Sequence, residues 1–330
     1  MSLIEQAVKR LEELQRAGAE GSDGPALQVP GRTTGATPAP EALLVRNLDE
    51  RKSGSHGHGA ASGRHHGSAA LHGAGAADIV GRAEDHERHI NLDFARLKQR
   101  GFVTPDATKS QIADEFRVLK RPIIRNAIGN DGVRVRNGNL VMVTSALPGE
   151  GKTFTSVNLA LSIATEVDST VLLVDGDVAH PAIPGLLGCP HGPGLLDLLT
   201  RDDLDFGSAM IRTNIDKLRL LPAGARHRRS TELLASEQMA ALLRELASRY
   251  PDRIIVFDSP PLLATTEARV LATHMGQIVM VVAADATSQH AVTQALSTVE
   301  NCDIVMMALN KARRTDVGTY YGYYGDDEPA

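Results

Sequence analysis

A single segment near the middle of the chain restricts its fold most strongly. Residues 144–153 read TSALPGEGKT and lie between an apolar strand candidate, 139–145, and a helix candidate, 153–166. This spacing is that of a P-loop, with Ala146 in place of the usual first glycine. Small residues allow successive main-chain N–H groups to turn toward a phosphate, and the following helix adds the positive end of its dipole. The segment therefore predicts a strand–loop–helix unit that binds nucleotide phosphates.

Side chains in and beside this loop have the chemistry that ATP and Mg²⁺ require. Lys152 supplies a positive charge for the β- and γ-phosphates, and the Thr153 hydroxyl is a ligand for the metal. Asn310 follows the last predicted strand, where an adenine contact and a strand-ending turn are equally compatible with the sequence. The expected nucleotide contacts are Pro148, Gly149, Glu150, Gly151, Lys152, Thr153, Phe154 and Asn310.

Three aspartates at the ends of predicted strands complete the expected site. Asp258 ends the apolar run 253–258 and is followed by Ser-Pro-Pro, as a Walker B aspartate is, although alone it would be an ordinary capping residue. Asp175 and Asp177 close the strand 170–175, where two acids repel each other unless a cation or a proton joins them. A turn-forming Asp-Gly pair is the alternative. The expected metal ligands are Thr153, Asp175 and Asp258, and the expected catalytic residues are Lys152, Asp175 and Asp177.

Strands and helices alternate along the globular part of the chain. Apolar runs without polar alternation predict strands that are covered on both faces, and the strand–helix alternation predicts a doubly wound, mostly parallel α/β sheet. Ligands of such sheets bind at the carboxyl ends of the strands. Pro122 is expected to bend or break the first helix. Further strands are expected at 217–221, 277–284 and 303–309, and further helices at 109–128, 230–249, 265–274 and 288–300.

Composition divides the chain into four parts. Residues 1–18 place apolar side chains at helical spacing opposite charged ones, which predicts an amphipathic helix that docks a partner or packs on its own domain. Residues 19–100 are rich in Gly, Ala, Pro, Ser and His and have little to bury, so we expect a disordered linker. Globular patterning runs over 101–317, and residues 318–330 form a flexible tyrosine-rich tail.

Charge and hydropathy disfavour several classes of protein. The formal charge of −5 argues against nucleic acid as a partner. No apolar run reaches the roughly 18 residues of a membrane-spanning helix, and the first residues do not have the pattern of a secretory signal. Cys189 and Cys302 have neither disulfide nor metal-ligand spacing, which is typical of a reducing compartment. We therefore expect a cytoplasmic protein.

Taken together, these motifs resemble those of the bacterial tyrosine kinases. That family combines a P-loop of this type with a DxDxxxP motif, here at 175–181, and a DxPP motif, here at 258–261. The resemblance implies a P-loop NTPase domain of the MinD/ParA-like, deviant Walker kind. Residues 220–236 are similar to a segment of the exopolysaccharide autokinases that accompany exosortase systems. The family's ExxRxxR motif forms subunit contacts, and the matching residues here are Asp114, Arg117 and Lys120.

The end of the chain agrees with this resemblance. Residues 319–325 read TYYGYYG and hold four of the five tyrosines of the chain. An aromatic patch for self-association is one interpretation, whereas members of the family present such a tail as their own substrate. The resemblance therefore implies an ATP-dependent protein-tyrosine autokinase whose phosphoacceptors are Tyr320, Tyr321, Tyr323 and Tyr324.

The resemblance also implies a cellular setting. Kinases of this kind that lack a membrane span act with a membrane activator of the polysaccharide chain-length-determinant, or co-polymerase, type, and a cognate tyrosine phosphatase reverses the modification. We expect a homo-oligomer at the inner face of the plasma membrane that regulates exopolysaccharide biosynthesis and export. One alternative is a positioning ATPase of the ParA/MinD type, whose signature lysine is replaced here by Leu147. Another is a nucleotide-sensing scaffold without catalysis.

Overall fold

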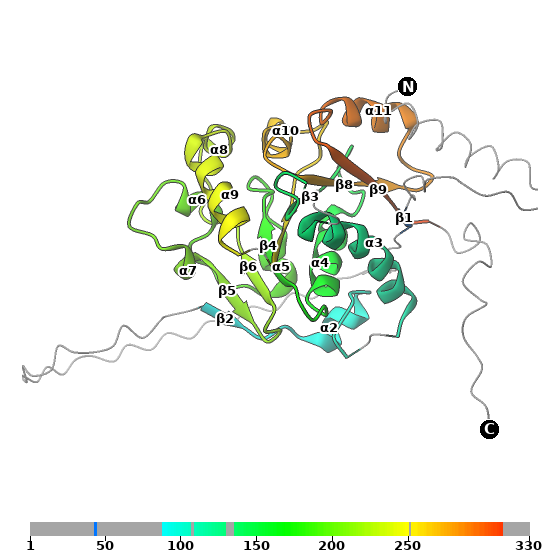
Figure 1. Cartoon of the computed structure of the whole chain (residues 1–330), viewed down its shortest axis with the longest axis horizontal. Helices are drawn as coiled ribbons and strands as arrows, with labels where there is room; N and C mark the ends of the chain where they lie inside the picture. The colour runs from blue at the N-terminus through cyan, green and yellow to red at the C-terminus, as the bar shows by residue number, and fades with distance from the viewer. Residues whose placement is uncertain (1–42, 45–87, 107–108, 130–134, 251, 313–330) are drawn as a thin grey trace, which may run out of the picture.

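The computed structural model describes a core domain and leaves out several expected segments (Figure 1). The expected helix over 1–18, most of the expected linker, and the tail with its four tyrosines lie outside the described residues. The described residues are 43–44, 88–106, 109–129, 135–250 and 252–312.

A single sheet of nine strands runs through the residues that the structure describes. Its strands are β1 (Leu43–Leu44), β2 (Arg88–Ile90), β3 (Leu140–Ser145), β4 (Thr170–Asp175), β5 (Ile211–Thr213), β6 (Leu218–Leu221), β7 (Arg253–Asp258), β8 (Gln277–Ala283) and β9 (Ile304–Asn310). Their order across the sheet is β1-β9-β8-β3-β7-β4-β6-β5-β2, and only the pair of β5 with β6 is antiparallel. The expected doubly wound, mostly parallel α/β fold is confirmed.

Helices cover both faces of this sheet, as Figure 1 shows. On one face lie α2 (Phe94–Gln99), α3 (Gln111–Ile128), α4 (Lys152–Ile163) and α5 (Ile183–Leu187). On the other lie α6 (Leu195–Leu198), α7 (Phe206–Ala209), α8 (Ser230–Leu234), α9 (Glu237–Arg249), α10 (Thr266–Ala272) and α11 (Gln289–Ser297). Within the described ranges, no helix is both long and apolar enough to cross a lipid bilayer.

Alternate residues of the central strands enter opposite cores. In β3, Val141 and Val143 pack with α3 and α4, whereas Met142 packs with the helices of the other face. Because both faces are covered, these strands need no polar positions, which explains the apolar runs of the sequence. The same alternation in β4 and β7 directs Asp175 and Asp258, one residue beyond the last apolar positions, toward the face that carries α4.

Two expected helices differ from those observed. Ser236 divides the expected helix 230–249 into α8 and α9, because its side chain accepts a hydrogen bond from the N–H of Met239 and caps the second helix. In contrast, α3 continues through Pro122, so the expectation of a break before that residue is wrong, and a bend there stays a prediction. The proline ring removes one main-chain hydrogen bond, and buried apolar side chains on both sides of it hold the helix against the sheet.

Described structure begins earlier than the expected boundary at residue 101. β2 and α2 lie within residues 88–99, where composition predicts linker. β2 adds a strand to the edge of the sheet, parallel to β5. The Arg88 guanidinium donates hydrogen bonds to the carbonyl oxygens of Pro190 and Pro193, both at 2.7 Å, and of Ala209 at 3.3 Å. Arg88 therefore fastens the start of the domain to the loop that follows α5.

Candidate active site

The phosphate loop lies where the sequence predicts it. β3 ends at Ser145 and α4 begins at Lys152, so the loop joins a strand to a helix. Gly149 and Gly151 have φ angles of 81° and 100°, in the left-handed region that favours glycine. A Cβ on Gly151 would also lie 2.0 Å from Nδ2 of Asn310. Both main-chain conformation and space therefore require glycine at position 151.

Glu150 and Asn310 attach this loop to the ends of β8 and β9. The Glu150 side chain is buried, and its carboxylate accepts hydrogen bonds from the N–H of Leu147 at 2.6 Å, the N–H of Ala283 at 3.4 Å and the hydroxyl of Thr287. Nδ2 of Asn310 donates to the main-chain oxygen of Glu150 at 2.8 Å. Both side chains hold the loop in place, and an adenine contact by Asn310 stays a prediction.

Phe154 fixes the start of α4 in the core. Its ring lies 5.1 Å from the Phe102 ring and 6.4 Å from the Phe116 ring, measured between centroids. Because the side chain of Phe154 packs in the core, only its main-chain N–H is left to make the predicted nucleotide contact, which stays a prediction. The aromatic contacts orient the helix whose amino end faces the loop.

Asp175 and Asp258 end neighbouring strands as register partners of β4 and β7. Both are buried, and the N–H of Ile183 donates to Oδ2 of Asp175 at 3.1 Å. Oδ1 of Asp175 and both carboxylate oxygens of Asp258 have no hydrogen-bond partner of ordinary geometry. Burial, and next the charge of Asp258, raise the pKa of Asp175 to about 8. The sheet thus holds two carboxylates side by side in a dry environment, which is costly without a cation or a proton.

Residues of the loop and of α4 face Asp258. Burial raises the pKa of Asp258 to about 6, while the Thr153 hydroxyl and the charge of Lys152 oppose that rise. Thr153 is close enough to influence the pKa although it does not meet ordinary hydrogen-bond geometry with the carboxylate. Ser156, which the sequence analysis missed, acts in the same direction. Its spacing of three residues from Thr153 on one helix is the signal that identifies it, because such residues share a helix face.

Asp177 lies beside the buried pair and is the most accessible of the three acids. Its side chain is partly exposed, whereas Asp175 and Asp258 are buried. Oδ1 of Asp177 accepts a hydrogen bond from the N–H of His180 at 3.1 Å. The charge of Asp177 contributes to the raised pKa values of both Asp175 and Asp258. The structure therefore brings together all three predicted aspartates near the phosphate loop.

The side chains at this edge fit a hard divalent cation such as Mg²⁺. Three buried carboxylate oxygens lack partners, and the Thr153 hydroxyl lies near Asp258. Oxygen ligands of this kind are those that Mg²⁺ prefers, with water and nucleotide phosphates completing its coordination. No cluster of three or more His, Cys, Asp or Glu side chains is arranged for a metal among the described residues. The donor set therefore suits a metal bound together with a nucleotide.

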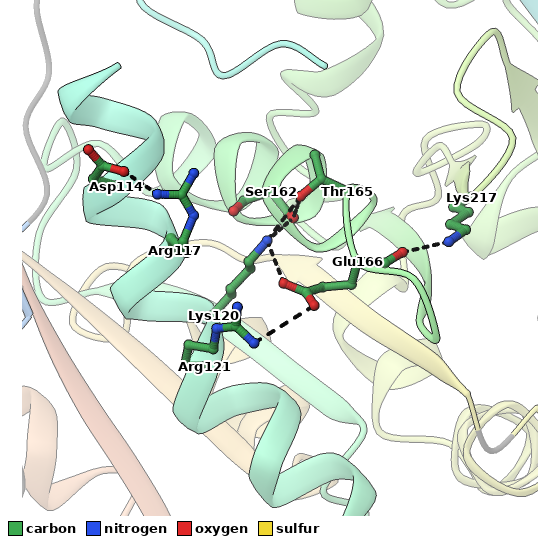
Figure 2. A network of polar contacts seen from close by, with 8 residues as sticks. All are labelled: Asp114, Arg117, Lys120, Arg121, Ser162, Thr165, Glu166 and Lys217. Carbon is green, nitrogen blue, oxygen red and sulfur yellow. Dashed lines mark hydrogen bonds and ion pairs between the residues drawn. The ribbon is translucent and has the colours of Figure 1, made fainter. Parts of the chain in front are cut away.

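The three residues of the predicted subunit-contact motif do not share one environment (Figure 2). The side chains of Asp114 and Arg117 are 57% and 44% exposed and form an ion pair on the surface of α3. Lys120 is buried within its own chain, where its ammonium group lies 2.8 Å from a carboxylate oxygen of Glu166 and 2.6 Å from the carbonyl oxygen of Ser162. Lys120 is thus occupied within the chain, and a subunit contact stays a prediction for Asp114 and Arg117.

Comparison with known proteins gives a consistent assignment. Residues 139–311 match the family model described as AAA domain. Staphylococcus aureus CapB is 28% identical over 236 residues, which are 70% of this chain and 99% of CapB. The tyrosine-protein kinase YwqD of Bacillus subtilis is 28% identical over 228 residues, 69% of this chain and 92% of YwqD. The tyrosine-protein kinase wzc of Salmonella typhimurium is 32% identical over 189 residues, 56% of this chain and 26% of wzc.

Solved structures agree on the fold. The kinase domain of the Escherichia coli tyrosine kinase ETK superposes on this chain with a TM-score of 0.56 at 23% identity. The match spans 72% of this chain and 94% of that domain. The family model, the relatives that align along nearly their whole length and the architecture of the site lead to one conclusion. The chain belongs to the AAA domain family, and within it to the bacterial tyrosine kinases represented by YwqD.

Proposed function

We propose that this chain transfers the γ-phosphoryl group of ATP to tyrosines of its own C-terminal tail, in an Mg²⁺-dependent reaction. The observation that carries the proposal is the buried pair of Asp175 and Asp258, in register at the ends of β4 and β7 beside Lys152 and Thr153. Carboxylates without partners next to a phosphate loop are the arrangement that phosphoryl transfer requires. The similarity to YwqD supports tyrosine as the acceptor.

The residues of the site divide the work of this reaction among themselves. Lys152 and the amides of the loop bind the β- and γ-phosphates, while Thr153, Asp175 and Asp258 hold the metal. Mg²⁺, when bound, neutralises the charge that develops on the phosphate oxygens. The phenol oxygen attacks the γ-phosphorus, the bond to the β-phosphate oxygen breaks, and ADP leaves. Asp177 is the best candidate to accept the phenol proton, because its side chain is partly exposed and Asp175 already accepts a bond from Ile183.

The acceptors in this proposal are Tyr320, Tyr321, Tyr323 and Tyr324, which enter the site of a neighbouring subunit. Each phosphate adds a charge of about −1.5 to −2 at neutral pH. The tail already ends in Asp326, Asp327 and Glu328. A phosphorylated tail is therefore repelled by an acidic site loaded with nucleotide, and progressive modification loosens the assembly of subunits.

The cellular role that we propose is control of exopolysaccharide biosynthesis and export from the inner face of the plasma membrane. The supporting observation is that relatives include the succinoglycan biosynthesis transport protein ExoP of Rhizobium meliloti, 27% identical over 255 residues, 75% of this chain and 31% of ExoP. The proposed partners are a membrane activator of the chain-length-determinant, or co-polymerase, type and a cognate tyrosine phosphatase. Residues 1–18 are the proposed docking helix for the activator.

Incubation of the purified full-length chain with ATP, Mg²⁺ and the cytoplasmic segment of the activator tests this function. Phosphotyrosine mapping should show label on the tail of the wild type and none in Lys152→Ala. A variant with all four tail tyrosines changed to Phe should lose nearly all label while retaining ATP binding. Full labelling of the four-Phe variant would exclude the tail as acceptor, and a wild type that never labels tyrosine would refute the kinase function.

A further inference from the structure

The phosphate loop contains an acid that does not face the carboxylates of the active site. Glu150 is 3% exposed, although the neighbouring residues Leu147, Pro148 and Gly149 are exposed. Its two carboxylate oxygens are both occupied: one accepts from the N–H of Leu147 at 2.6 Å, and the other accepts from Thr287 and from the N–H of Ala283. The charge of this glutamate is therefore stabilised by hydrogen bonds within the protein.

The position of this charge has a consequence for nucleotide binding. A loop that binds phosphates must present amides and cations to a strongly negative ligand. A carboxylate of the same loop opposes binding if it turns toward the ligand, and supports binding if it fixes the amides. Thr287 lies in the turn that follows β8, and Ala283 is the last residue of that strand. The hydroxyl of Thr287 and the N–H of Ala283 hold the Glu150 carboxylate in the orientation that fixes the amides of the loop.

Thr287 is itself fixed by the turn in which it lies. Its N–H donates to the carbonyl oxygen of Ala283 at 3.1 Å, and its hydroxyl oxygen accepts from the N–H of Ala283 at 3.3 Å. The turn is joined to β9 as well, because the N–H of Ala284 donates to the carbonyl oxygen of Asn310 at 2.8 Å. The partner of Glu150 is therefore held in a turn that is hydrogen-bonded to the carboxyl ends of β8 and β9.

Asn310 completes the attachment on the main-chain side. Its amide group donates to the carbonyl oxygen of Glu150 at 2.8 Å and occupies the space that a side chain at position 151 would need. One residue of the loop is thus held by its side chain from β8 and by its main chain from β9. Such double attachment fixes the loop before any ligand arrives.

We propose that Glu150, Thr287 and Asn310 form a loop brace that preorganises the phosphate loop for nucleotide, with Thr287 as a positioning residue that touches no substrate atom. The inference rests on the proposed ATP-dependent function. A loop that must first adopt its binding shape has an affinity reduced by the fraction of molecules in that shape. Loss of the brace therefore weakens nucleotide binding and leaves the chemical step unchanged.

Two substitutions of Thr287 separate the hydroxyl from the bulk of the side chain. Thr287→Val keeps the shape and removes the hydrogen bond, whereas Thr287→Ser keeps the hydroxyl. Calorimetric titration of the full chain with ADP and Mg²⁺ should show about tenfold weaker binding for Thr287→Val, at unchanged stoichiometry, and binding within about twofold of the wild type for Thr287→Ser. In the kinase assay, Thr287→Val should raise the KM for ATP about tenfold with unchanged kcat.

A double-mutant cycle with Glu150→Gln tests the role of the charge. The single change Glu150→Gln should weaken ADP binding by about threefold, because the amide nitrogen cannot accept the bonds from Thr287 and Ala283. The loss stays small because the amide oxygen still accepts from Leu147 and no negative charge can turn toward the phosphates. On that background, Thr287→Val should cost less than about twofold. Strictly additive effects would overturn the brace, as would equal affinities of Thr287→Val and the wild type.

The outcomes also distinguish the brace from the proposed function. ADP binding needs no tyrosine acceptor, so a wild type that binds ADP but labels no tyrosine would refute the kinase proposal alone. A wild type that binds no ADP with Mg²⁺ present would refute both. A lowered stoichiometry for Thr287→Val, with unchanged affinity of the active fraction, would show a folding defect and overturn the positioning role.

Discussion

Two regions of the described structure each bury, wholly or in part, a pair of charged side chains, and the two pairs are arranged in opposite ways. Between α3 and the turn that follows α4, Lys120 and Glu166 form an ion pair of 2.8 Å, and Lys120 donates further bonds to Ser162 and Thr165 (Figure 2). At the carboxyl ends of β4 and β7, Asp175 and Asp258 carry like charges, and three of their four oxygens lack partners. The same sheet supports both arrangements.

The difference separates a structural charge pair from a functional one. Burial lowers the pKa of Lys120, and Glu166 beside it opposes that change, so the charges of this pair balance within the fold. Burial would raise the pKa of Glu166, but Lys120, together with the charges of Arg121 and Arg117, more than offsets this effect and lowers it. No such partner offsets the burial of Asp175, whose pKa reaches about 8. The fold thus retains at this site a repulsion between two carboxylates that binding of a cation or of a proton relieves.

The largest effect is expected from removing the unpaired acids. Asp175→Asn and Asp258→Asn should each lower the rate of tyrosine phosphorylation on the order of 10³-fold, because the charge that holds the metal is lost. Both changes should also stabilise the nucleotide-free chain at pH 8, since a buried charge is removed. Initial rates and thermal melts measure the two effects. Asp252→Asn, an exposed acid at the opposite end of β7, is the control and should change neither.

The paired region should respond in the opposite sense. Lys120→Ala leaves the Glu166 carboxylate with only the exposed Arg121 at 3.9 Å, so we expect a loss of about 3 kcal/mol in the free energy of unfolding. The affinity for ADP should not change. Arg121→Ala is the matched control and should cost less than about 0.5 kcal/mol, because its side chain is 61% exposed. Denaturant unfolding provides the comparison, and equal costs for the two variants would contradict it.

Among the described residues, the two buried acids of the site should dominate the pH dependence of stability. A carboxyl whose pKa is raised on folding binds more protons in the folded than in the unfolded chain, so stability falls as pH rises. With pKa values of about 8 for Asp175 and about 6 for Asp258, the fall should extend from about pH 4 to about pH 8. We expect a loss on the order of 5 kcal/mol between pH 5 and pH 8 in the nucleotide-free chain, most of it from Asp175.

Two conditions check the origin of that slope. Asp175→Asn should remove most of it, and saturating Mg²⁺ with ADP should flatten it, because the cation stabilises the ionised acids. Melting temperatures measured at each pH suffice. A slope that persists in both conditions would place its source outside the active site.

The smallest effect on stability is expected at the surface of α3. Asp114→Asn should change the free energy of unfolding by less than about 0.5 kcal/mol, because both side chains of its ion pair with Arg117 are exposed. The proposed subunit contact predicts a separate outcome, namely a lower oligomeric state in sedimentation. An unchanged oligomer in both Asp114→Asn and Arg117→Ala would remove these residues from the interface.

The parts of the fold that sequence predicts well are those in which local pattern and burial agree. The strands 170–175 and 253–258 match the observed bounds, because short apolar runs rich in Val, Ile and Leu that end in aspartate are typical of strands covered on both faces. The division of the expected helix 230–249 at Ser236 is not visible in the sequence, because a serine inside a helical pattern is also compatible with an uninterrupted helix. The three-residue strands β2 and β5 are too short to have a recognisable period.

The same distinction applies to the site. The acids and the phosphate loop follow from motifs, since each lies at a strand end and such ends meet at one edge of the sheet. Glu150 and Thr287 are 137 residues apart in the sequence, and no motif or spacing predicts that they form a contact. Nor does the sequence show that the Lys120 side chain is buried, because a lysine at that position of α3 is equally compatible with an exposed helix surface. Tertiary packing decides both.

The hydrogen bonds from Arg88 to the loop after α5 determine where a force applied at residue 88 enters the sheet. Its three hydrogen bonds and the short β2 strand attach residue 88 to the edge of the sheet beside β5, and β7, β4, β6 and β5 separate this edge from β3 and its phosphate loop. Tension applied at residue 88 would therefore act first on residues 190–193 and on β5. It would enter the sheet five strands away from β3, the strand that leads into the phosphate loop.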